Sequence, residues 1–272
     1  MPLPIKPVSP TQPARLSDRD AKAPGSWPTG DALKSALAAE LEKLTELQAR
    51  LYADGRRALL VVLQGRDASG KDGTIRTVFG ACNPQGVVVT SFKSPTALEL
   101  SHDFLWRVHQ AVPPKGMIGV FNRSHYEDVL VVRVRDLVSR AVWSARFSQI
   151  NEFERTLANN GVVILKFCLH ISKEEQREQF LERLTDPTKN WKFRAADLDD
   201  RARWSAFTVA YRDALTRCST PWAPWYVVPS DSKTARNYIV ARTVNEALER
   251  LGLKYPKAPK EVLALREKLA RE

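Results

Sequence analysis

Five short apolar segments alternate with longer helical patterns along this chain, and this alternation constrains the fold more than any other feature. Each segment is nearly continuous in its apolar character, which is typical of strands buried on both faces. The segments are RALLVVLQG (57–65), GVVVTSF (86–92), GMIGVFNRS (116–124), VVILKFCLH (162–170) and WYVVPS (225–230). Strands that alternate with helices form parallel sheets covered on both sides. The sequence therefore predicts an α/β protein, a three-layer α/β/α sandwich around a parallel five-stranded sheet.

Helical patterns fill the stretches between these segments, and several carry capping signals. Ser94 followed by Pro95 predicts a helix start, with the serine as cap and the proline in the first turn. Ser172 and Glu175 match a capping box, and Gly161 ends the pattern that precedes the fourth strand. The helices expected from these patterns cover 31–53, 94–112, 143–160, 172–185, 197–218 and 233–251.

The first thirty residues differ from the rest of the chain. Residues 1–30 contain seven prolines and little periodicity, which predicts an extended arm that lies along the domain or along a partner subunit. No internal repeat or linker divides residues 31–272, so a single domain is expected there. Leucines spaced three and four apart make 31–53 amphipathic, and such a helix packs in the core or joins subunits.

The chain of 272 residues carries a net charge of +11, which favours an anionic partner. Nucleic acid, an acidic membrane surface and a phosphate-rich small molecule all fit this charge, and so does a surface that is merely soluble. Three scattered cysteines argue against disulfides and a zinc site. Because no apolar leader opens the chain and no apolar run approaches the ~20 residues of a membrane span, a cytoplasmic location is expected.

The stretch QGRDASGKDG (64–73) nearly matches the phosphate loop G-x-x-x-x-G-K-[ST]. Gly65 ends an apolar strand and Lys71 begins a helix, so backbone N–H groups and the positive helix end would face an anion there. Two acids depart from the general pattern, because Asp72 replaces the hydroxyl residue and Asp67 lies inside the loop. The motif predicts phosphate binding, against the alternative of a glycine-rich turn that binds nothing.

The two acids suggest a metal ion in this loop. In the general motif, the hydroxyl that Asp72 replaces is a ligand of magnesium, and a carboxylate is a harder oxygen ligand that can take over this role. Asp67 is expected to face the interior of the loop, which favours metal binding. Asp72 fits a metal ligand and a cap of the helix start equally well.

The third strand leads into a second polar cluster. The run IGVFNRSHYEDVLVVRV (118–134) places Asn122 and Arg123 at the strand end, with Glu127 and Asp128 just beyond. Ligands of open α/β sheets bind at the carboxyl ends of the strands, where an acid on a neighbouring strand can hold magnesium through water. Arg123 can bind phosphate through two parallel hydrogen bonds. Surface ion pairs are the weaker alternative for this cluster, and the neighbouring loop disfavours it further.

Four sequence blocks together resemble the polyphosphate kinase 2 family, in matching order over about residues 30–255. The blocks are GRDASGKDG (65–73), FNRSHYEDVLVVRV (121–134), LERLTDPTKNWKF (181–193) and WYVVPSDSKTARN (225–237). The resemblance implies a P-loop kinase fold with a helical lid over about 182–200. It also implies magnesium-dependent phosphoryl transfer between inorganic polyphosphate and AMP or ADP, giving ADP or ATP.

The resemblance also implies roles for individual residues. The residues expected to be catalytic are Asp67, Lys71, Arg123, Asp128 and Arg183, with Asp67 and Asp128 as metal ligands. The residues expected to bind the nucleotide are Asn122, Arg123, Glu127 and Arg183. The residues expected to bind polyphosphate are Gly65, Arg66, Ala68, Ser69, Gly70, Lys71, Asp72, Gly73, Lys93, Arg133 and Lys189. The HYED run resembles the subgroup that accepts both AMP and ADP, whereas ADP-preferring members tend to carry asparagine near Glu127.

The expected chemistry needs no general base, because the attacking terminal phosphate, with a second pKa of about 6, is largely ionised at pH 7. Asp67, Glu127 and Asp128 are therefore expected to bind metal and position substrates. His125 is expected to pack or to hydrogen bond without a catalytic role. The expected partners are Mg²⁺ with Mn²⁺ as a substitute, inorganic polyphosphate and purine nucleotides, and further copies of the chain in a dimer or tetramer. Nucleic acid and membranes are not expected partners.

Two rival functions fit parts of the same sequence. An ATP-dependent nucleoside monophosphate kinase of thymidylate-kinase type would share the loop and the lid. A non-enzymatic nucleic-acid binder would explain the net charge of +11, although the sequence contains no recognition module.

Overall fold

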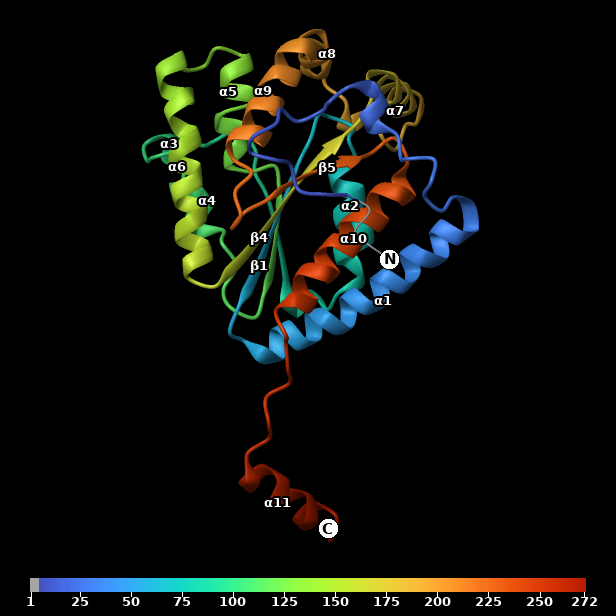
Figure 1. Ribbon diagram of the computed structural model, residues 1–272, viewed down its shortest axis with the longest axis vertical. Helices are drawn as coiled ribbons and strands as arrows, with labels where there is room; N and C mark the ends of the chain where they lie inside the picture. The colour runs from blue at the N-terminus through green and yellow to red at the C-terminus, as the bar shows by residue number, and fades with distance from the viewer. Residues whose placement is uncertain (1–4) are drawn as a thin grey trace.

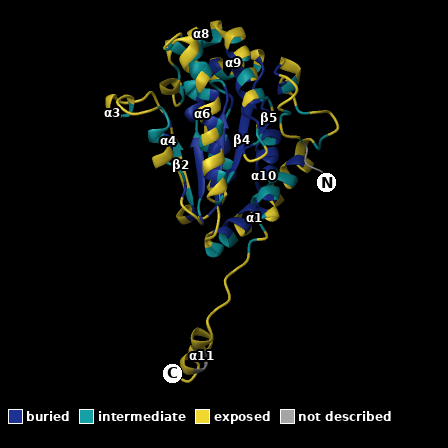
Figure 2. Ribbon diagram, turned by 60° about the vertical axis from the view of Figure 1, so that its left-hand side comes forward, coloured by how far each residue is buried: buried dark blue, intermediate teal, exposed yellow. Residues whose placement is uncertain are grey.

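All five predicted strands join one sheet, and every neighbouring pair runs parallel. In the computed structural model, which describes residues 5–272, the strand order is β2-β3-β1-β4-β5 (Figure 1). The strands are β1 (Ala58–Gln64), β2 (Val87–Ser91), β3 (Ile118–Asn122), β4 (Val162–His170) and β5 (Trp225–Pro229). The central strand β1 is buried along its whole length (Figure 2). The predicted five-stranded parallel sheet is confirmed.

Helices cover both faces of this sheet. The helices on one face are α1 (Gly30–Asp54), α2 (Lys71–Val78) and α10 (Lys233–Arg250), and those on the other are α6 (Arg140–Asn159) and α9 (Trp204–Arg217). The two faces bury separate apolar clusters, one around Leu59 and Ile239 and one around Leu60 and Phe147. Leu59 and Leu60 point to opposite sides because successive strand residues alternate. The predicted three-layer α/β/α arrangement is therefore confirmed.

Two predicted helices are each broken into two. The stretch 94–112 contains α3 (Ala97–Leu100) and α4 (Trp106–Gln110) in place of one helix. Its cap is Thr96 and not Ser94, because the Thr96 hydroxyl accepts a hydrogen bond from the Glu99 backbone N–H. The Glu99 carboxylate in turn accepts one from the Thr96 N–H, which completes a capping box.

The stretch 197–218 is likewise interrupted. It contains α8 (Ala195–Ala202) and α9, which meet at Arg203. The remaining α-helices are α5 (Val131–Val134), α7 (Lys173–Thr185) and α11 (Lys260–Leu269). Short 3-10 helices are η1 (Asp18–Ala21), η2 (Phe79–Ala81), η3 (Pro84–Gly86), η4 (His125–Asp128) and η5 (Asn190–Lys192). As predicted, Ser172 caps α7, because its hydroxyl accepts a hydrogen bond from the Glu175 N–H.

The described part of the N-terminal arm lies along the domain beside the edge strand β5. The Val8 N–H donates to the Trp225 carbonyl oxygen at 2.8 Å, and the Ser219 hydroxyl donates to the Val8 carbonyl oxygen at 2.7 Å. Further along the arm, Leu16 and Ala21 are buried. The arm therefore packs on the chain's own domain, while the division at residue 30 stays a prediction.

The C-terminal helix α11 was not predicted. It projects away from the body at the end of an extended segment (Figures 1 and 2). Leu263, Leu265 and Leu269 on this helix are exposed. Among the described residues, no helix combines the length and apolar character that crossing a bilayer requires.

Candidate active site

The carboxyl ends of the strands bring the predicted polar segments to one edge of the sheet. Leu63 of β1 lies opposite Asn122 of β3 in the parallel register. The loop that follows β1 and the η4 segment that follows β3 therefore begin side by side. This edge is where ligands of open α/β sheets bind, and helices α7, α8 and α9 gather above it (Figure 1).

The backbone of the phosphate loop needs its glycines. Gly70 has a φ of 94°, a conformation that side chains rarely tolerate, and it immediately precedes α2. A Cβ atom on Gly70 would lie 2.0 Å from Nη1 of Arg236 in α10, and one on Gly65 would lie 2.5 Å from Oγ of Ser69. Ala68 also has a positive φ of 65°. Such turns direct successive N–H groups to one side, which suits an anion.

Lys71 folds back onto its own loop. Its Nζ atom donates to the carbonyl oxygens of Gly65 at 2.7 Å and of Arg66 at 3.1 Å. Burial, followed by the nearby Arg123 charge, lowers the pKa of Lys71 to about 8, against the opposing pull of Asp67. The ammonium group is therefore held beside the loop in a position set by backbone atoms.

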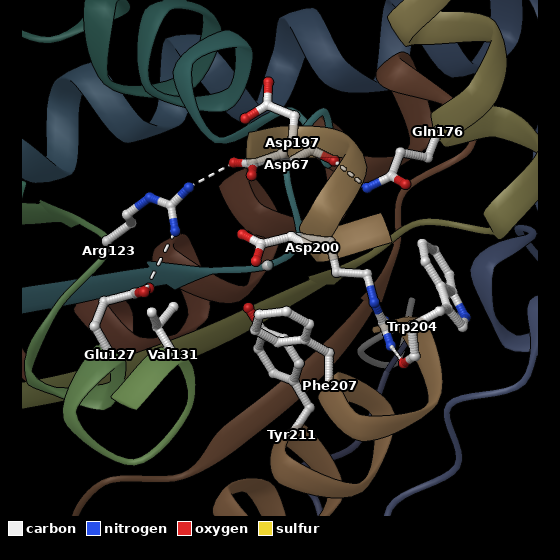
Figure 3. A pocket seen from close by; sticks show the side chains of 12 residues that line it. Asp67, Arg123, Glu127, Val131, Gln176, Asp197, Asp200, Trp204, Phe207 and Tyr211 are labelled. Atoms are coloured by element: carbon white, nitrogen blue, oxygen red, sulfur yellow. Dashed lines mark hydrogen bonds and ion pairs between the residues drawn. The ribbon is translucent and has the colours of Figure 1, made fainter. Parts of the chain in front are cut away.

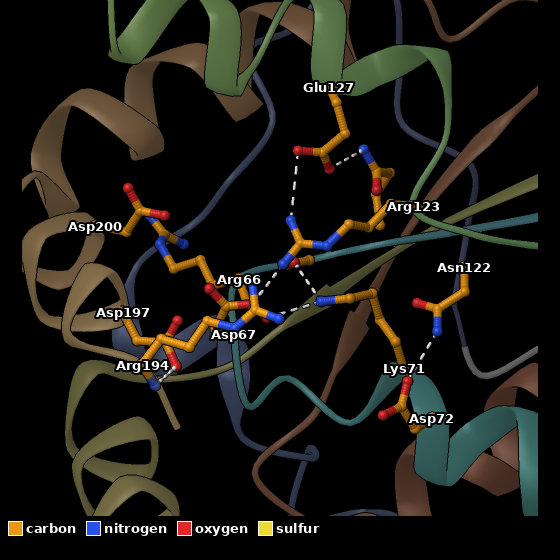
Figure 4. A network of polar contacts seen from close by, with 12 residues as sticks. Arg66, Asp67, Lys71, Asp72, Asn122, Arg123, Glu127, Arg194, Asp197 and Asp200 are labelled. Atoms are coloured by element: carbon orange, nitrogen blue, oxygen red, sulfur yellow. Dashed lines mark hydrogen bonds and ion pairs between the residues drawn. The ribbon is translucent and has the colours of Figure 1, made fainter. Parts of the chain in front are cut away.

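Arg123 links the two predicted clusters (Figure 4). Its guanidinium forms an ion pair with Asp67 of the phosphate loop and another, at 3.4 Å, with Glu127 of η4. Burial alone would raise the pKa of Asp67, but Lys71, Arg123 and Arg183 together hold it below its ordinary value. The carboxylate of Asp67 is therefore ionised and surrounded by three cations.

Several other predicted residues join the same network. The Asn122 side-chain amide donates to the Asp72 carboxylate at 2.8 Å, which ties the end of β3 to the first turn of α2. Glu127 also accepts a hydrogen bond from Gln64 at 3.1 Å. Arg183 of α7 lies near enough to Asp67 to lower its pKa electrostatically. The structure thus brings together the loop, the β3 end and one lid arginine.

A pocket lies between this network and the helices above it (Figure 3). The side chains of Trp204, Phe207 and Tyr211 on α9 form an aromatic part of its wall, and Asp197 and Asp200 of α8 add two carboxylates. Burial and the nearby Asp67 raise the pKa of Asp197.

The sequence did not identify these residues as part of the site, nor Gln176 of α7, whose amide donates to the Asp67 carbonyl oxygen at 2.9 Å. Asp197 and Asp200 lie in the predicted lid, while the signal for the others was membership of predicted helices. Because periodicity marks a helix without saying which loop it faces, only the tertiary structure identifies them.

Asp128, the second predicted metal ligand, lies in η4 after the end of β3. It pairs with Arg146 of α6, which donates to the Asp128 carboxylate at 3.1 Å and to its backbone carbonyl oxygen at 3.0 Å. Burial raises the pKa of Asp128, against the lowering effect of Arg146. The two predicted metal ligands are thus each paired with an arginine.

Four of the cations predicted to bind polyphosphate lie on separate segments of the chain. Arg66 stacks on the Trp204 ring at 4.0 Å and donates to the Thr208 hydroxyl at 2.6 Å. Arg133 pairs with Asp213 at 2.7 Å, and Lys189 pairs with two acids at the end of α7. Lys93 is exposed. A role of these four residues in binding polyphosphate stays a prediction.

His125 is buried beside the site and not inside it. Its Nε2 atom lies 3.2 Å from the Glu154 carboxylate, which also accepts from the Tyr126 hydroxyl at 2.9 Å. Lys166 of β4 pairs with the same carboxylate and donates to the Tyr126 oxygen at 2.7 Å. The expected hydrogen-bonding role of His125 is confirmed.

Comparison with known proteins agrees with this geometry. Residues 29–255 match the polyphosphate kinase 2 family. An AMP/ADP-polyphosphate phosphotransferase of Meiothermus ruber is 54% identical over 225 residues, which covers 83% of this chain and 84% of that protein. An ADP-polyphosphate phosphotransferase of Rhodopseudomonas palustris is 42% identical over 283 residues, covering 95% of this chain and 98% of that protein.

A solved structure shows the same architecture. The crystal structure of polyphosphate kinase 2 from Arthrobacter aurescens TC1 superposes with a TM-score of 0.87 at 39% sequence identity. The superposition covers 97% of this chain and all of that chain, at 100%. The phosphate loop, the polar β3 end and the helices above them thus occur in a fold shared along nearly the whole length. This chain belongs to the polyphosphate kinase 2 family.

Proposed function

We propose that this protein transfers phosphoryl groups between inorganic polyphosphate and AMP or ADP, giving ADP or ATP. The observation that carries the proposal is the network in which Arg123 contacts Asp67 of the phosphate loop and Glu127 of η4. It joins a loop shaped for phosphate to a second polar segment, so that two phosphate compounds can meet at one edge of the sheet. The names of the two relatives above support these substrates.

The arrangement suits catalysis by alignment and charge neutralisation. Phosphoryl transfer has a loose transition state, and the protein acts mainly by positioning the reacting groups and stabilising charge. Lys71 and the loop N–H groups would hold the polyphosphate, while Asn122 and Arg123 would hold the nucleotide phosphate. Arg183 would approach from α7. An ionised phosphate attacks directly, which leaves no role for a base.

The acids of the site fit a magnesium ion. Carboxylate oxygens are ligands that Mg²⁺ prefers, and it is usually bound by one or two of them together with substrate phosphates. Against the opposing effect of burial, its cationic neighbours hold the pKa of Asp67 below its ordinary value, so this carboxylate is ionised, as such a site requires. Asp67 and Asp128 would hold the ion, and Mn²⁺ could replace it. When bound, the metal neutralises phosphate charge.

The proposal extends to the residues around the loop and to the lid. Polyphosphate carries roughly one charge per phosphate, so a long chain needs cations beyond Lys71. We propose Lys93, Arg133 and Lys189 for this role, with the lid over about 182–200 bringing the last of them closer. A cytoplasmic location and a dimer or tetramer complete the proposal.

The rival functions receive less support. The matched relatives are polyphosphate phosphotransferases, which does not favour an ATP-dependent monophosphate kinase of thymidylate-kinase type. The positive charge that suggested nucleic acid includes Arg123 and Arg133, which pair with Asp67 and Asp213.

One assay separates these possibilities. The purified protein is incubated with long-chain polyphosphate and magnesium, with AMP, ADP, GMP or GDP as acceptor in separate reactions. We expect ADP and ATP to form from the adenine nucleotides. If no acceptor is phosphorylated from polyphosphate while ATP phosphorylates a monophosphate, the rival kinase is correct. If neither donor works and duplex DNA binds tightly at physiological salt, the nucleic-acid reading gains instead.

A further inference from the structure

Arg236, in the first turns of α10, lies buried directly behind the phosphate loop. Only 4% of its surface is exposed. Its Nε atom donates to the Thr74 hydroxyl at 2.9 Å, and its Nη1 atom donates to the Ser69 carbonyl oxygen at 3.4 Å. A Cβ atom on Gly70 or Gly73 would contact the same guanidinium, at 2.0 and 3.3 Å respectively. The side chain therefore contacts the end of the loop, at Ser69 and Gly70, and the first turn of α2.

Among the described residues, the hydrogen-bond partners of this guanidinium are all neutral. Besides Thr74 and Ser69, they include the Asn237 side-chain oxygen, at 3.3 Å. Within the described chain, no carboxylate forms an ion pair with Arg236. A buried charge without a partner of opposite sign is costly, and proteins normally pair such groups.

Two helix N-termini near Arg236 add to the positive electrostatic potential at the phosphate loop. Arg236 lies close to the N-terminus of α10, which begins at Lys233, and beside the first turn of α2, which begins at Lys71. Helix N-termini carry partial positive charge. Burial lowers the pKa of Arg236 to about 10, so the guanidinium keeps its proton at neutral pH. Two helix ends and one full charge thus converge behind the loop.

We propose that the polyphosphate bound in the loop is the counter-ion of Arg236, which attracts it through the loop backbone without touching it. The inference rests on the proposed function, because it requires phosphate in this loop. Arg236 is a positioning residue: it fixes the Ser69–Gly70 backbone and adds a charge that water cannot screen well. It also gives position 70 a second reason to be glycine besides its φ of 94°, since a Cβ there would lie 2.0 Å from the guanidinium.

A neutral substitution separates the charge from the hydrogen bonds. R236K keeps the charge but loses the forked shape, R236Q keeps a donor without the charge, and R236M loses both. The matched control is R242M on the same helix, because Arg242 is paired with Glu40 at 2.9 Å and with Glu246. Because Arg242 has carboxylate partners, removing its charge should destabilise the fold without weakening the binding of tripolyphosphate.

The test measures binding of inorganic tripolyphosphate by calorimetry and by the rise in Tm that it causes, at fixed ionic strength with magnesium. We expect R236Q and R236M to bind about tenfold more weakly and to lose most of the Tm rise. R236K should keep most of the affinity and most of the Tm rise. R242M should show the full Tm rise, starting from a lower Tm. In kinetics, KM for polyphosphate should increase more than kcat decreases.

The outcomes distinguish the two levels of the proposal. If the wild-type protein binds no tripolyphosphate and makes no ATP, the proposed function is wrong. If the wild type binds and the neutral variants bind equally well, only the role of Arg236 is wrong. Should R236K lose as much as R236Q, the hydrogen-bond geometry and not the charge is responsible. If R236M does not fold, R236Q still allows a variant without the charge to be compared with R236K and the wild type.

Discussion

The Nζ atom of Lys71 lies 2.7 Å from the carbonyl oxygen of Gly65, six residues earlier in the same loop. A second contact, to the Arg66 carbonyl oxygen at 3.1 Å, fixes the ammonium group between the loop and Arg123. We expect a cation in this position to meet the phosphates of a bound polyanion without a large change of the loop backbone. The expected role of Lys71 is therefore electrostatic, and it should be separable from folding.

We expect Lys71→Ala to leave a folded protein whose turnover is at least about 10²-fold lower. Removing one preorganised group that stabilises developing charge typically costs this much or more. The measurement is the rate of ATP formation from ADP and polyphosphate, with circular dichroism as the check on folding. A near-normal rate would mean that the site lies elsewhere on the molecule.

The pH dependence of binding should follow the same lysine. Burial lowers the pKa of Lys71 to about 8 in the folded protein, whereas its ordinary value is 10.5. The folded protein therefore loses this charge as the pH rises through about 8, and its affinity for tripolyphosphate should weaken above that pH. Affinity measured at pH 7 and pH 9 tests this, and K71M should remove the dependence.

The stability contribution of Lys71 should change in the opposite direction. Between about pH 8 and 10.5 the unfolded chain keeps the proton that the folded chain releases. Stability rises with pH wherever the unfolded state binds more protons. As the pH rises through this window, the free energy of unfolding of the wild type should therefore increase relative to that of K71M, by up to about 1.4 kcal/mol per pH unit. A constant difference between the two proteins would contradict the lowered pKa.

Asp128 is expected to matter for magnesium in spite of its contact with Arg146. We expect Asp128→Ala to fold and to lose about 10²-fold or more in turnover, with a higher magnesium concentration needed for half-maximal rate. A magnesium titration of the initial rate measures both effects. Glu249→Ala is the control, because Glu249 is an exposed acid paired with Lys43, far along α10. An unchanged magnesium requirement in Asp128→Ala would remove this residue from the metal site.

Glu127 is predicted to favour AMP as an acceptor. Its carboxylate holds Arg123 in place, and AMP, which has one phosphate, should depend on that position more than ADP does. We expect Glu127→Asn to lower kcat/KM for AMP at least about fivefold more than for ADP. Steady-state kinetics with each acceptor measure the ratio, and Glu127→Gln tests whether the charge or the length matters. Equal losses for both acceptors would contradict the assignment to the subgroup that accepts both.

The sheet could be predicted because its signals are local. Each strand is a continuous apolar run between turn residues, and the alternation with helices leaves few other arrangements. The predicted helix boundaries were less accurate where a helix starts or breaks at a single residue. The cap at Thr96, which needs its partner Glu99, and the break at Arg203 have no strong periodic signal.

The candidate site also has parts that the sequence predicted and parts that it did not. The phosphate loop and the β3 end were predicted because each is a contiguous motif, and the parallel register places them together. Trp204 and Asp197 come from helices whose orientation depends on tertiary packing, so the sequence did not reveal them. Arg133 was predicted to bind polyphosphate from its charge and position, and the structure adds that it pairs with Asp213, which the sequence did not indicate.

The buried ion pair between Lys166 and Glu154 makes a prediction about stability beside the site. Lys166 is 0% exposed, and its three donors reach Glu154, the Tyr126 hydroxyl and the Cys218 carbonyl oxygen. Lys166→Met would leave the Glu154 carboxylate buried without its cation, which typically costs about 3–5 kcal/mol. Urea denaturation at pH 7 measures this loss as a shift of the midpoint.

The matched variant removes both charges. Because an apolar pair of similar volume often replaces a buried ion pair without loss, Lys166→Met combined with Glu154→Leu should recover most of the stability. Activity should not recover in parallel, since Glu154 also holds His125 and Tyr126, which immediately precede Glu127 and Asp128. A double variant that is stable yet slow would show that the buried pair positions the η4 segment. One that is stable and fully active would show that packing alone holds that segment in place.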